Sequence, residues 1–304
     1  MNATFRQLRL FLALAETGSV SAAARLMHVT QPTASMQLKE IASSVGLPLY
    51  EVIGKSLRLT EVGQELAATA RAMSLSWEAF EQSVDGIKGL SRGKLRVAVV
   101  STAQYFMPRV IGSFCKKYPH IDVALEVLNR DGVVQRLREA LDDLYIMSMP
   151  PTNVDLHDEI VMPNPIVVIA SAAEAATLKC KIKLQALASA RFILREPGSG
   201  TRMAVNHHFQ KKKFKPHVRL ELGSNEAVKE SVAAGLGIGV VSRHVLHGMD
   251  TENGVRVIHV EGFPLPSAWH MVHHAQQKIS PAAMAFKVHL MAEIERGRFE
   301  RYAR

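Results

Sequence analysis

Residues 15–66 read AETGSVSAAARLMHVTQPTASMQLKEIASSVGLPLYEVIGKSLRLTEVGQEL, and this stretch decides how the N-terminal unit folds. A first helix overlaps its start: apolar residues recur at helical spacing, with Thr4 as a candidate N-cap and Gly18 as the end. Ser21 is then expected to cap a short second helix over residues 22–27, whose small side chains allow neighbouring helices to approach closely.

A third helix follows at Thr30, its expected N-cap, with Pro32 in the first turn, where a missing N–H costs nothing. Leu38 and Ile41 are predicted to face the core, and Gly46 ends the helix. The opposite face carries polar or flexible groups that can reach base edges and phosphates in a major groove. These residues are Gln31, Thr33, Ser35, Met36 and Lys39.

Apolar and polar residues then alternate over residues 49–52 and 57–59, on both sides of a turn at Gly54. This pattern predicts a hairpin on which Lys55 and Arg58 would face DNA phosphates, as in the wing of a winged helix-turn-helix. The alternative is a small helical subdomain whose polar face is only solvated.

Thr60 is the expected cap of a long linker helix with apolar residues at alternating steps of four and three. They are Leu66, Ala70, Met73, Trp77, Phe80, Val84 and Ile87. A seam of this heptad type predicts two helices packed side by side, with dimer contacts from Leu66, Met73, Trp77 and Phe80. One amphipathic helix lying on its own domain is the alternative. Pairing is favoured because the two aromatic residues stand in an otherwise polar segment. Residues 89–93 are expected to form a hinge.

From Lys94 onward, short strands alternate with helices. Strands are predicted over residues 95–99, 121–127 and 144–147, with a helix ending at 117 and another over about 132–141. A second set of strands is predicted over 166–170, 192–194, 218–222 and 238–241, with helices after Gly200, after Ser224 and in the C-terminal tail. This order is typical of α/β lobes with parallel strands and a cleft between them.

The expected organisation is therefore an α/β protein with three parts. They are a DNA-binding domain over residues 1–60, a linker and hinge over 61–92, and an effector-binding domain over 93–304. The two lobes of the last part are expected over about 93–163 plus 267–304, and over about 164–266.

Three segments place hydrogen-bond donors at the predicted cleft, namely residues 101–104, 196–202 and 224–226. Free N–H groups at a helix N-terminus, together with hydroxyls and an arginine, favour an anion. The glycines flanking Ser199 would let a ligand approach the backbone closely. Ser224 is better explained as an ordinary N-cap. The loop lacks the lysine of a P-loop and the glycine spacing of a dinucleotide fingerprint.

Composition narrows the class of protein. The chain has 304 residues, with 37 lysines and arginines against 28 acidic residues, a net charge of +9. This excess permits an anionic partner such as DNA but does not demand one. Two isolated cysteines, Cys115 and Cys180, suit a reducing compartment. The N-terminus does not resemble a signal peptide, and no apolar run is long enough to cross a bilayer. We therefore expect a cytoplasmic protein without membrane contact.

No catalytic constellation is evident. The pairs His207–His208 and His273–His274 have no further ligand at metal-binding spacing, so neither metal nor cofactor is expected. Asp142 and Asp143 are interpreted as a solvated turn. The lysines 211–213 are interpreted as a solvated helix end, with phosphate or DNA contact as the weaker alternative. A transport component would need a signal peptide, and an enzyme would need a nucleophile, cofactor lysine or metal set.

The N-terminal stretch quoted above strongly resembles the DNA-binding domain of LysR-type transcriptional regulators. Four further stretches look like the Calvin-cycle branch of that family, which regulates RuBisCO operons. They read STAQYFMPRVIGSFCKKYPHIDVALEV (101–127), LDDLYIMSMPP (141–151), FILREPGSGTRMAV (192–205) and LELGSNEAVKESVAAGLGIGVVSRH (220–244). The resemblance implies a winged helix-turn-helix and a two-lobed effector domain with the fold of periplasmic binding proteins.

The resemblance also implies partners and site residues. It implies a homodimer that pairs again into a homotetramer, an interrupted inverted repeat in promoter DNA, and regulation of carbon-fixation genes. The effector would be a small anion, either a phosphorylated sugar or acid, or NADPH. The cleft residues would be Ser101, Thr102, Gln104, Ser148, Ser199, Gly200, Thr201, Arg202 and Asn225. Two positions depart from the family pattern, because Val52 replaces a frequent arginine and Gln104 a frequent lysine. Either Arg202 or Arg195 would supply the missing cation, or the effector would carry less charge. A LysR-type regulator of another metabolic operon is the nearest alternative.

Overall fold

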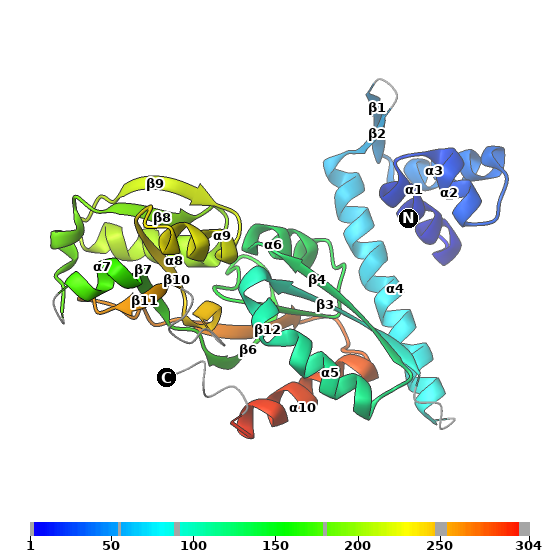
Figure 1. Cartoon of the computed structure of the whole chain (residues 1–304). Helices are drawn as coiled ribbons and strands as arrows, with labels where there is room; N and C mark the ends of the chain where they lie inside the picture. Colours follow the sequence, from blue (N-terminus) through cyan, green and yellow to red (C-terminus); the bar gives the residue numbers. More distant parts are fainter. Residues whose placement is uncertain (1–2, 54–55, 88–91, 179–180, 247–253, 298–304) are drawn as a thin grey trace.

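A computed structural model describes residues 3–53, 56–87, 92–178, 181–246 and 254–297. A small N-terminal head and a two-lobed α/β body are joined by one long helix (Figure 1). The head contains α1 (Phe5–Thr17), α2 (Val20–Leu26), α3 (Gln31–Val45), β1 (Tyr50–Ile53) and β2 (Ser56–Leu59), and the long helix is α4 (Glu61–Ile87). Among the described residues, no helix is long and apolar enough to cross a membrane.

The helix ends of the head follow local capping rules. Thr4 caps α1 and Gly18 ends it in the left-handed conformation; Thr30 caps α3 and Gly46 ends it in the same way, as predicted. The prediction for α2 is wrong, because its cap is Ser19, whose side chain accepts a hydrogen bond from Ala22 N. The left-handed turn at Gly18 leaves Ser19 extended at the helix entrance, so the helix begins before the predicted residue 22.

The core of the head is built from the inward-facing residues of its helices. Phe11 and Leu14 of α1 and Leu38 of α3 are buried against Ala67 and Ala70 at the start of α4. The Thr60 hydroxyl accepts from Gly63 N at 3.1 Å, which confirms the predicted cap. The first turns of α4 therefore belong to the head's own core.

The wing is confirmed as an antiparallel hairpin, with β1 paired to β2 from Tyr50 opposite Leu59 to Ile53 opposite Ser56. Its predicted turn residues, Gly54 and Lys55, lie outside the described residues, as does most of the hinge predicted over residues 89–93.

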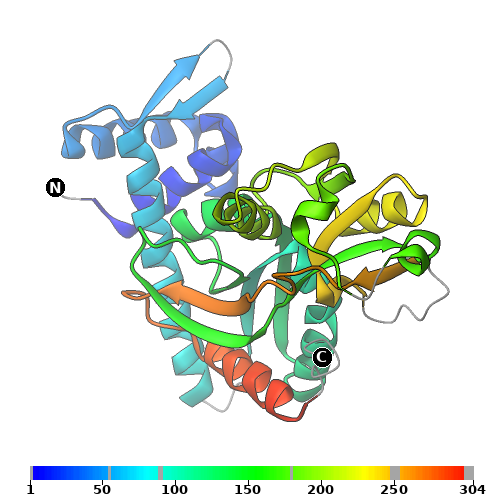
Figure 2. The ribbon, with the colours of Figure 1, turned by 90° about the vertical axis from the view of Figure 1, so that its left-hand side faces the viewer.

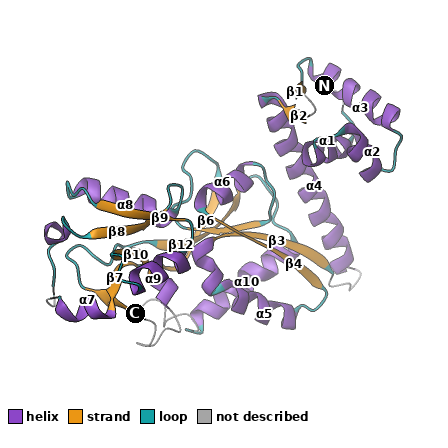
Figure 3. Cartoon of the chain, turned by 45° about the horizontal axis from the view of Figure 1, so that its top comes forward, coloured by secondary structure: helices purple, strands orange, loops and turns teal. Residues whose placement is uncertain are grey.

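The first lobe is a five-stranded sheet in the order β4-β3-β5-β12-β6. Its strands are β3 (Gly93–Val100), β4 (Ile121–Leu128), β5 (Leu144–Met147), β6 (Leu156–Pro163) and β12 (Ala268–His274). Its helices are η1 (Ser101–Tyr105), α5 (Met107–Lys117), α6 (Arg130–Arg138) and α10 (Pro281–Glu295). The helices cover both faces of the sheet, α5 and α10 on one and α6 on the other (Figures 1 and 3). The parallel pairing of β3 with β4 and β5 confirms the predicted βαβαβ order.

The second lobe is a five-stranded sheet in the order β11-β7-β10-β8-β9. Its strands are β7 (Ile166–Ser171), β8 (Arg191–Arg195), β9 (His217–Leu222), β10 (Ile238–Ser242) and β11 (Val255–Ile258). Its helices are α7 (Ala172–Thr177), η2 (Leu184–Leu187), α8 (Gly200–Lys211), α9 (Asn225–Ala233) and η3 (Arg243–Leu246). Successive strand residues point to opposite faces, so Val168 packs towards Phe209 of α8 while Val167 packs towards Val228 of α9.

Two connections carry the chain between the lobes, and Figure 2 shows β6 and β12 running towards them side by side. They meet where Asn164 N donates to Ser267 O at 2.7 Å and Ser242 Oγ donates to Asn164 Oδ1 at 2.6 Å. The sequence patterns missed β6 and β12, because their polar residues interrupt the alternation that marks a strand. They also missed β11, which is only four residues long.

One further helix is confirmed with different bounds, and one further prediction is wrong. The helix expected over residues 132–141 is α6, which starts earlier because Asn129 accepts from Gly132 N at 2.9 Å. Asp142 and Asp143, expected to be solvated, are 1% and 8% exposed. Two nitrogens of Arg136 donate to Asp142, and the backbone N–H of Arg96 donates to Asp143 at 2.7 Å. Burial raises the pKa of Asp143 to about 6, against the opposing effect of Arg96.

Candidate functional site: a helix face, a linker seam and an interlobe cleft

The N-terminal half of α3 presents its polar residues on one open surface. Gln31, Met36 and Lys39 are exposed and Ser35 is half-buried, and together they line a shallow hollow with Pro32, Glu40 and Ser43. Thr33 is partly used by the helix cap, because its hydroxyl lies 2.8 Å from that of Thr30. A helix with this face exposed fits the width of a DNA major groove and can donate to and accept from base edges.

The wing offers fewer polar contacts. Arg58 is exposed on β2, while Val52 on β1 is 69% exposed and apolar. Lys55 lies outside the described residues. Within the part of the hairpin that the structure describes, Arg58 is thus the cation that can contact a phosphate.

The linker helix exposes large apolar side chains along one side. Met73, Trp77 and Phe80 are 47%, 51% and 55% exposed, whereas Leu66 packs partly against the core of the head. The Trp77 ring lies between those of Phe5 and Phe80, at centroid distances of 5.9 and 5.5 Å. Exposed aromatic clusters of this kind are typical of protein interfaces.

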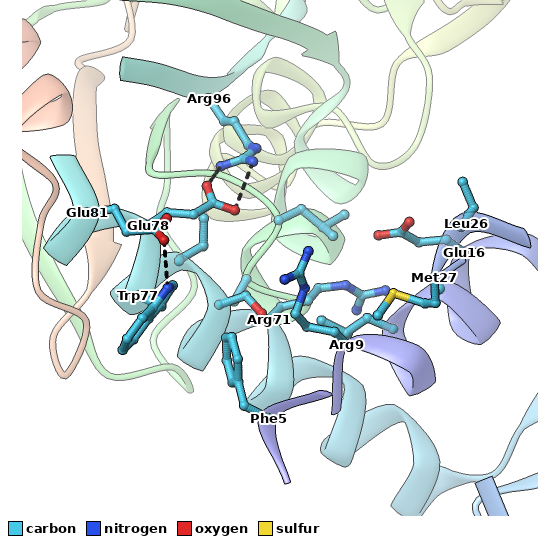
Figure 4. A pocket seen from close by; sticks show the side chains of 16 residues that line it. Phe5, Arg9, Glu16, Leu26, Met27, Arg71, Trp77, Glu78, Glu81 and Arg96 are labelled. Atoms are coloured by element: carbon cyan, nitrogen blue, oxygen red, sulfur yellow. Dashed lines mark hydrogen bonds and ion pairs between the residues drawn. The ribbon is translucent and has the colours of Figure 1, made fainter. Parts of the chain in front are cut away.

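Another side of α4 is joined to the first lobe (Figure 4). Arg96 of β3 donates to both carboxylate oxygens of Glu78, at 2.8 and 3.4 Å, and Gln82 Nε2 donates to the backbone of Lys94 at 3.2 Å. The Arg96–Glu78 pair borders a cavity of about 500 Å³ between head, linker and lobe. A movement of the first lobe would therefore be transmitted to α4 and the head.

Arg195 stands at the centre of the contact between the lobes and is 1% exposed. On its own lobe it donates to Asn225 Oδ1 at 2.7 Å and pairs with Glu196 at 2.8 Å. It also reaches Ser101 Oγ of the first lobe at 3.2 Å. Asn225 Nδ2 extends the contact to Thr102 Oγ1 at 3.5 Å. The predicted residues Ser101, Thr102 and Asn225 thus meet around an arginine that lay outside the predicted set.

The loop before α8 touches the first lobe directly. Ser199 is spent as the helix cap, accepting from Arg202 N at 3.1 Å, and Thr201 beside it is buried. A β-carbon on Gly200 would lie 2.5 Å from Ser148 Oγ, and one on Gly198 would lie 2.6 Å from Asp131 Oδ2. The close approach that the glycines permit is therefore made here by side chains of the first lobe.

Arg202 and Gln104 are two further predicted residues near the contact between the lobes. Arg202 is held within the second lobe, by Glu221 at 2.6 Å and by Arg195 O at 2.7 Å. Gln104 is half-buried beside Tyr105, whose hydroxyl donates to Glu226 across the lobes. Burial, followed by the contact with Glu226, raises the pKa of Tyr105.

Tyr105 was missed because it gains its role from the opposite lobe. Glu226 lies in a segment that was expected at the cleft, and Arg195 was expected there only as one of two arginines that could replace the missing lysine at position 104. The available signal for Arg195 was its place at the end of a strand, three residues before Gly198.

Replacing Gly198 with alanine is expected to weaken the contact between the lobes. Gly198 has φ +90°, and its new methyl group would meet the Asp131 carboxylate. Strain and overpacking together should reduce the free energy of unfolding by about 1–3 kcal/mol, measured by urea denaturation.

Gly235→Ala is the matched control, because Gly235 has φ +73° and nothing within 4 Å of its added methyl group. The prediction is contradicted if both variants lose the same free energy of unfolding and if adding Asp131→Ala to Gly198→Ala restores none of it. The contact between Gly198 and Asp131 would then contribute nothing to stability.

No group of three or more potential metal ligands is found among the residues that the structure describes. The chain also resembles proteins of known class along nearly its whole length. The family model described as "Bacterial regulatory helix-turn-helix protein, lysR family" matches residues 5–64, and "LysR substrate binding domain" matches residues 88–294.

Two curated relatives and one solved structure extend this match. The HTH-type transcriptional activator CmpR of Synechocystis sp. is 38% identical over 97% of both chains. The RuBisCO operon transcriptional regulator of Acidithiobacillus ferrooxidans is 39% identical over 96% of this chain and 94% of its own. The regulatory domain of Synechocystis CcmR, solved in complex with 2-PG, is 41% identical with a TM-score of 0.64, covering 66% of this chain and 97% of that one.

Proposed function

Because the chain belongs to the LysR family of bacterial transcriptional regulators, we propose that it reads promoter DNA with α3 and the wing and responds to a small anion between its lobes. Its relatives are named as regulators, so the chain is a regulator and not an enzyme. The observation that carries the proposal is the chain of contacts from Ser101 through Arg195 to Asn225, which ties both lobes to one buried cation.

Carbon-fixation genes are the proposed targets. Two relatives that match nearly the full length are named RuBisCO operon transcriptional regulators, at 39% and 38% identity. A regulator of another metabolic operon is the second candidate, and a carbon-fixation operon beside the gene would decide against it.

The proposed effector is a small phosphorylated acid. The relative CcmR was solved with 2-phosphoglycolate, and Arg195 supplies a guanidinium group suited to a phosphate or carboxylate. Arg130, whose Nε donates to Met149 O at 2.8 Å, adds a second cation near Gly200. These two arginines supply the positive charge that a lysine at position 104 would otherwise provide.

The proposed mechanism is a change in lobe closure. An anion that takes over hydrogen bonds of Arg195 alters its hold on Ser101, and hence the balance between closed and open lobes. Through the Arg96–Glu78 pair, this shift reaches α4 and the head. In a dimer joined along α4, and in a tetramer made from two such dimers, it changes the spacing of the heads and the bend of the DNA.

Replacing Gln31 with alanine is expected to weaken binding to the operator by about 1–3 kcal/mol, which is roughly 5- to 150-fold, because a base-edge contact is lost. Ser35→Ala should act in the same direction with a smaller effect. Both are measured by gel shift with the promoter upstream of the regulated operon, at fixed salt concentration.

Gln185→Ala is the control, an exposed glutamine on η2 in the second lobe. The assignment of α3 as the recognition helix fails if Gln31→Ala and Gln185→Ala bind the operator equally well.

A further inference from the structure

A second cavity, of about 430 Å³, lies along α8 and contains none of the predicted effector residues. α8 contributes Ala204, His207, His208 and Lys211 to it, and the facing wall includes Leu265 and His270. Met149 closes one side of the cavity. It directly follows Ser148, whose side chain lies against Gly200. This cavity gathers the His207–His208 pair and Lys211, motifs that DNA binding and the interlobe cleft leave unused.

The wall of this cavity is mainly apolar, and Lys211 is the charged side chain in its lining. Its lining contains a lysine and three histidines but no aspartate or glutamate. Among the described residues, neither His207 nor Lys211 has a hydrogen bond or ion pair from its side chain, whereas His270 is held by Asp158 at 2.7 Å. Lys211 and His207 are thus available to a ligand, and the apolar residue Leu265 faces its other side.

His208 is a partly buried group of the same wall. Its ring packs against Phe263 with centroids 5.1 Å apart, and its Nε2 is buried without a hydrogen-bond partner among the described residues. Burial lowers the pKa of His208, and the nearby Lys212 and Lys211 lower it further. The lysines therefore repel a proton from this ring, and the same potential attracts an anion.

We propose that this cavity is a second anion site, which takes a small organic phosphate or carboxylate. Lys211 and His207 would hold the anionic group, and Leu265 would contact the carbon part. The site lies along the same helix whose first turn, at Ser199 and Gly200, touches the first lobe. A 12-residue helix is roughly 18 Å long, so both sites can act on one rigid element.

The test is equilibrium dialysis of the full-length protein with radiolabelled inorganic phosphate, repeated with labelled acetate to distinguish the phosphate and carboxylate forms of the ligand. Lys211→Gln is expected to weaken the binding of whichever anion occupies the cavity by about tenfold, because one charge-assisted hydrogen bond is lost. Ala204→Leu, which fills the cavity without removing charge, should weaken it as well.

Lys213→Gln is the matched control, because Lys213 is also exposed at the end of α8 but does not line the cavity. The expected change there is less than about twofold, because an exposed charge that does not contact the anion is largely screened by salt and solvent. The proposal is overturned if neither anion binds, if Lys211→Gln and Lys213→Gln weaken binding equally, or if Ala204→Leu leaves it unchanged. Each variant is first checked by thermal unfolding, so that a folding defect is not counted as lost binding.

Discussion

Replacing Trp77 and Phe80 together by alanine is expected to raise the dissociation constant of the dimer by about a thousandfold. Each aromatic side chain is more than half exposed in the single chain, and both lie on the predicted heptad seam of α4. Buried aromatic residues at the centre of an interface contribute roughly 2 kcal/mol or more each, and about 4 kcal/mol corresponds to three powers of ten. Sedimentation equilibrium over a range of protein concentrations measures the shift.

The control for this variant is Met284→Ala with Val288→Ala on α10. These residues are 44% and 61% exposed, so the amount of exposed apolar surface is comparable while the helix is different. A dimer that tolerates loss of Trp77 and Phe80, or that weakens equally in the α10 variant, contradicts pairing along α4. Because Trp77 also packs against Phe5, thermal unfolding must show that the head remains folded.

Replacing Arg195 with methionine is expected to lower the free energy of unfolding by about 3 kcal/mol, the lower end for a broken buried ion pair. The loss has two sources. Asn225, which is 1% exposed, would lack a partner for its side-chain oxygen, and Glu196 would lose its counterion. Because the Glu196 side chain is 22% exposed, water offsets part of that second cost. Urea denaturation measures the change.

The same variant tests the effector cleft. Calorimetry with 2-phosphoglycolate is expected to show an affinity at least about tenfold lower than that of the original chain, because a charge-assisted hydrogen bond is removed. Arg191→Met is the matched control, an exposed arginine at the other end of the same strand. An unchanged affinity in Arg195→Met, despite the lower stability, would make Arg195 a structural residue and remove it from the effector site.

Features that depend on neighbouring residues alone could be predicted from the sequence. Thr4, Thr30 and Thr60 cap helices because the hydrogen bonds involved span three residues of chain. Gly18 and Gly46 end helices because a left-handed residue is needed there. Ser19 and Ser21 are both suitable N-caps for α2, and the preference for serine at the N-cap could not by itself decide between them.

The contacts between the lobes show what a pattern of neighbouring residues in the sequence cannot predict. Arg195 and Arg202 both flank the Gly-Ser-Gly loop and look equally suited to an anion. Glu221, on the neighbouring strand β9, holds Arg202, whereas Ser101, from the other lobe, meets Arg195. Asp142 and Asp143 are buried for a similar reason, since Arg136 and the backbone of Arg96 supply their partners.

The amino-acid sequence by itself determined the helix-turn-helix, the wing and the order of the main strands, because periodicity and capping act over a few residues. It also marked Trp77 and Phe80 as a seam. Only the tertiary structure decided which side chains meet between the lobes, and that β12 lies between β5 and β6. Those contacts join residues about 100 positions apart, so they depend on which surfaces the folded lobes bring together.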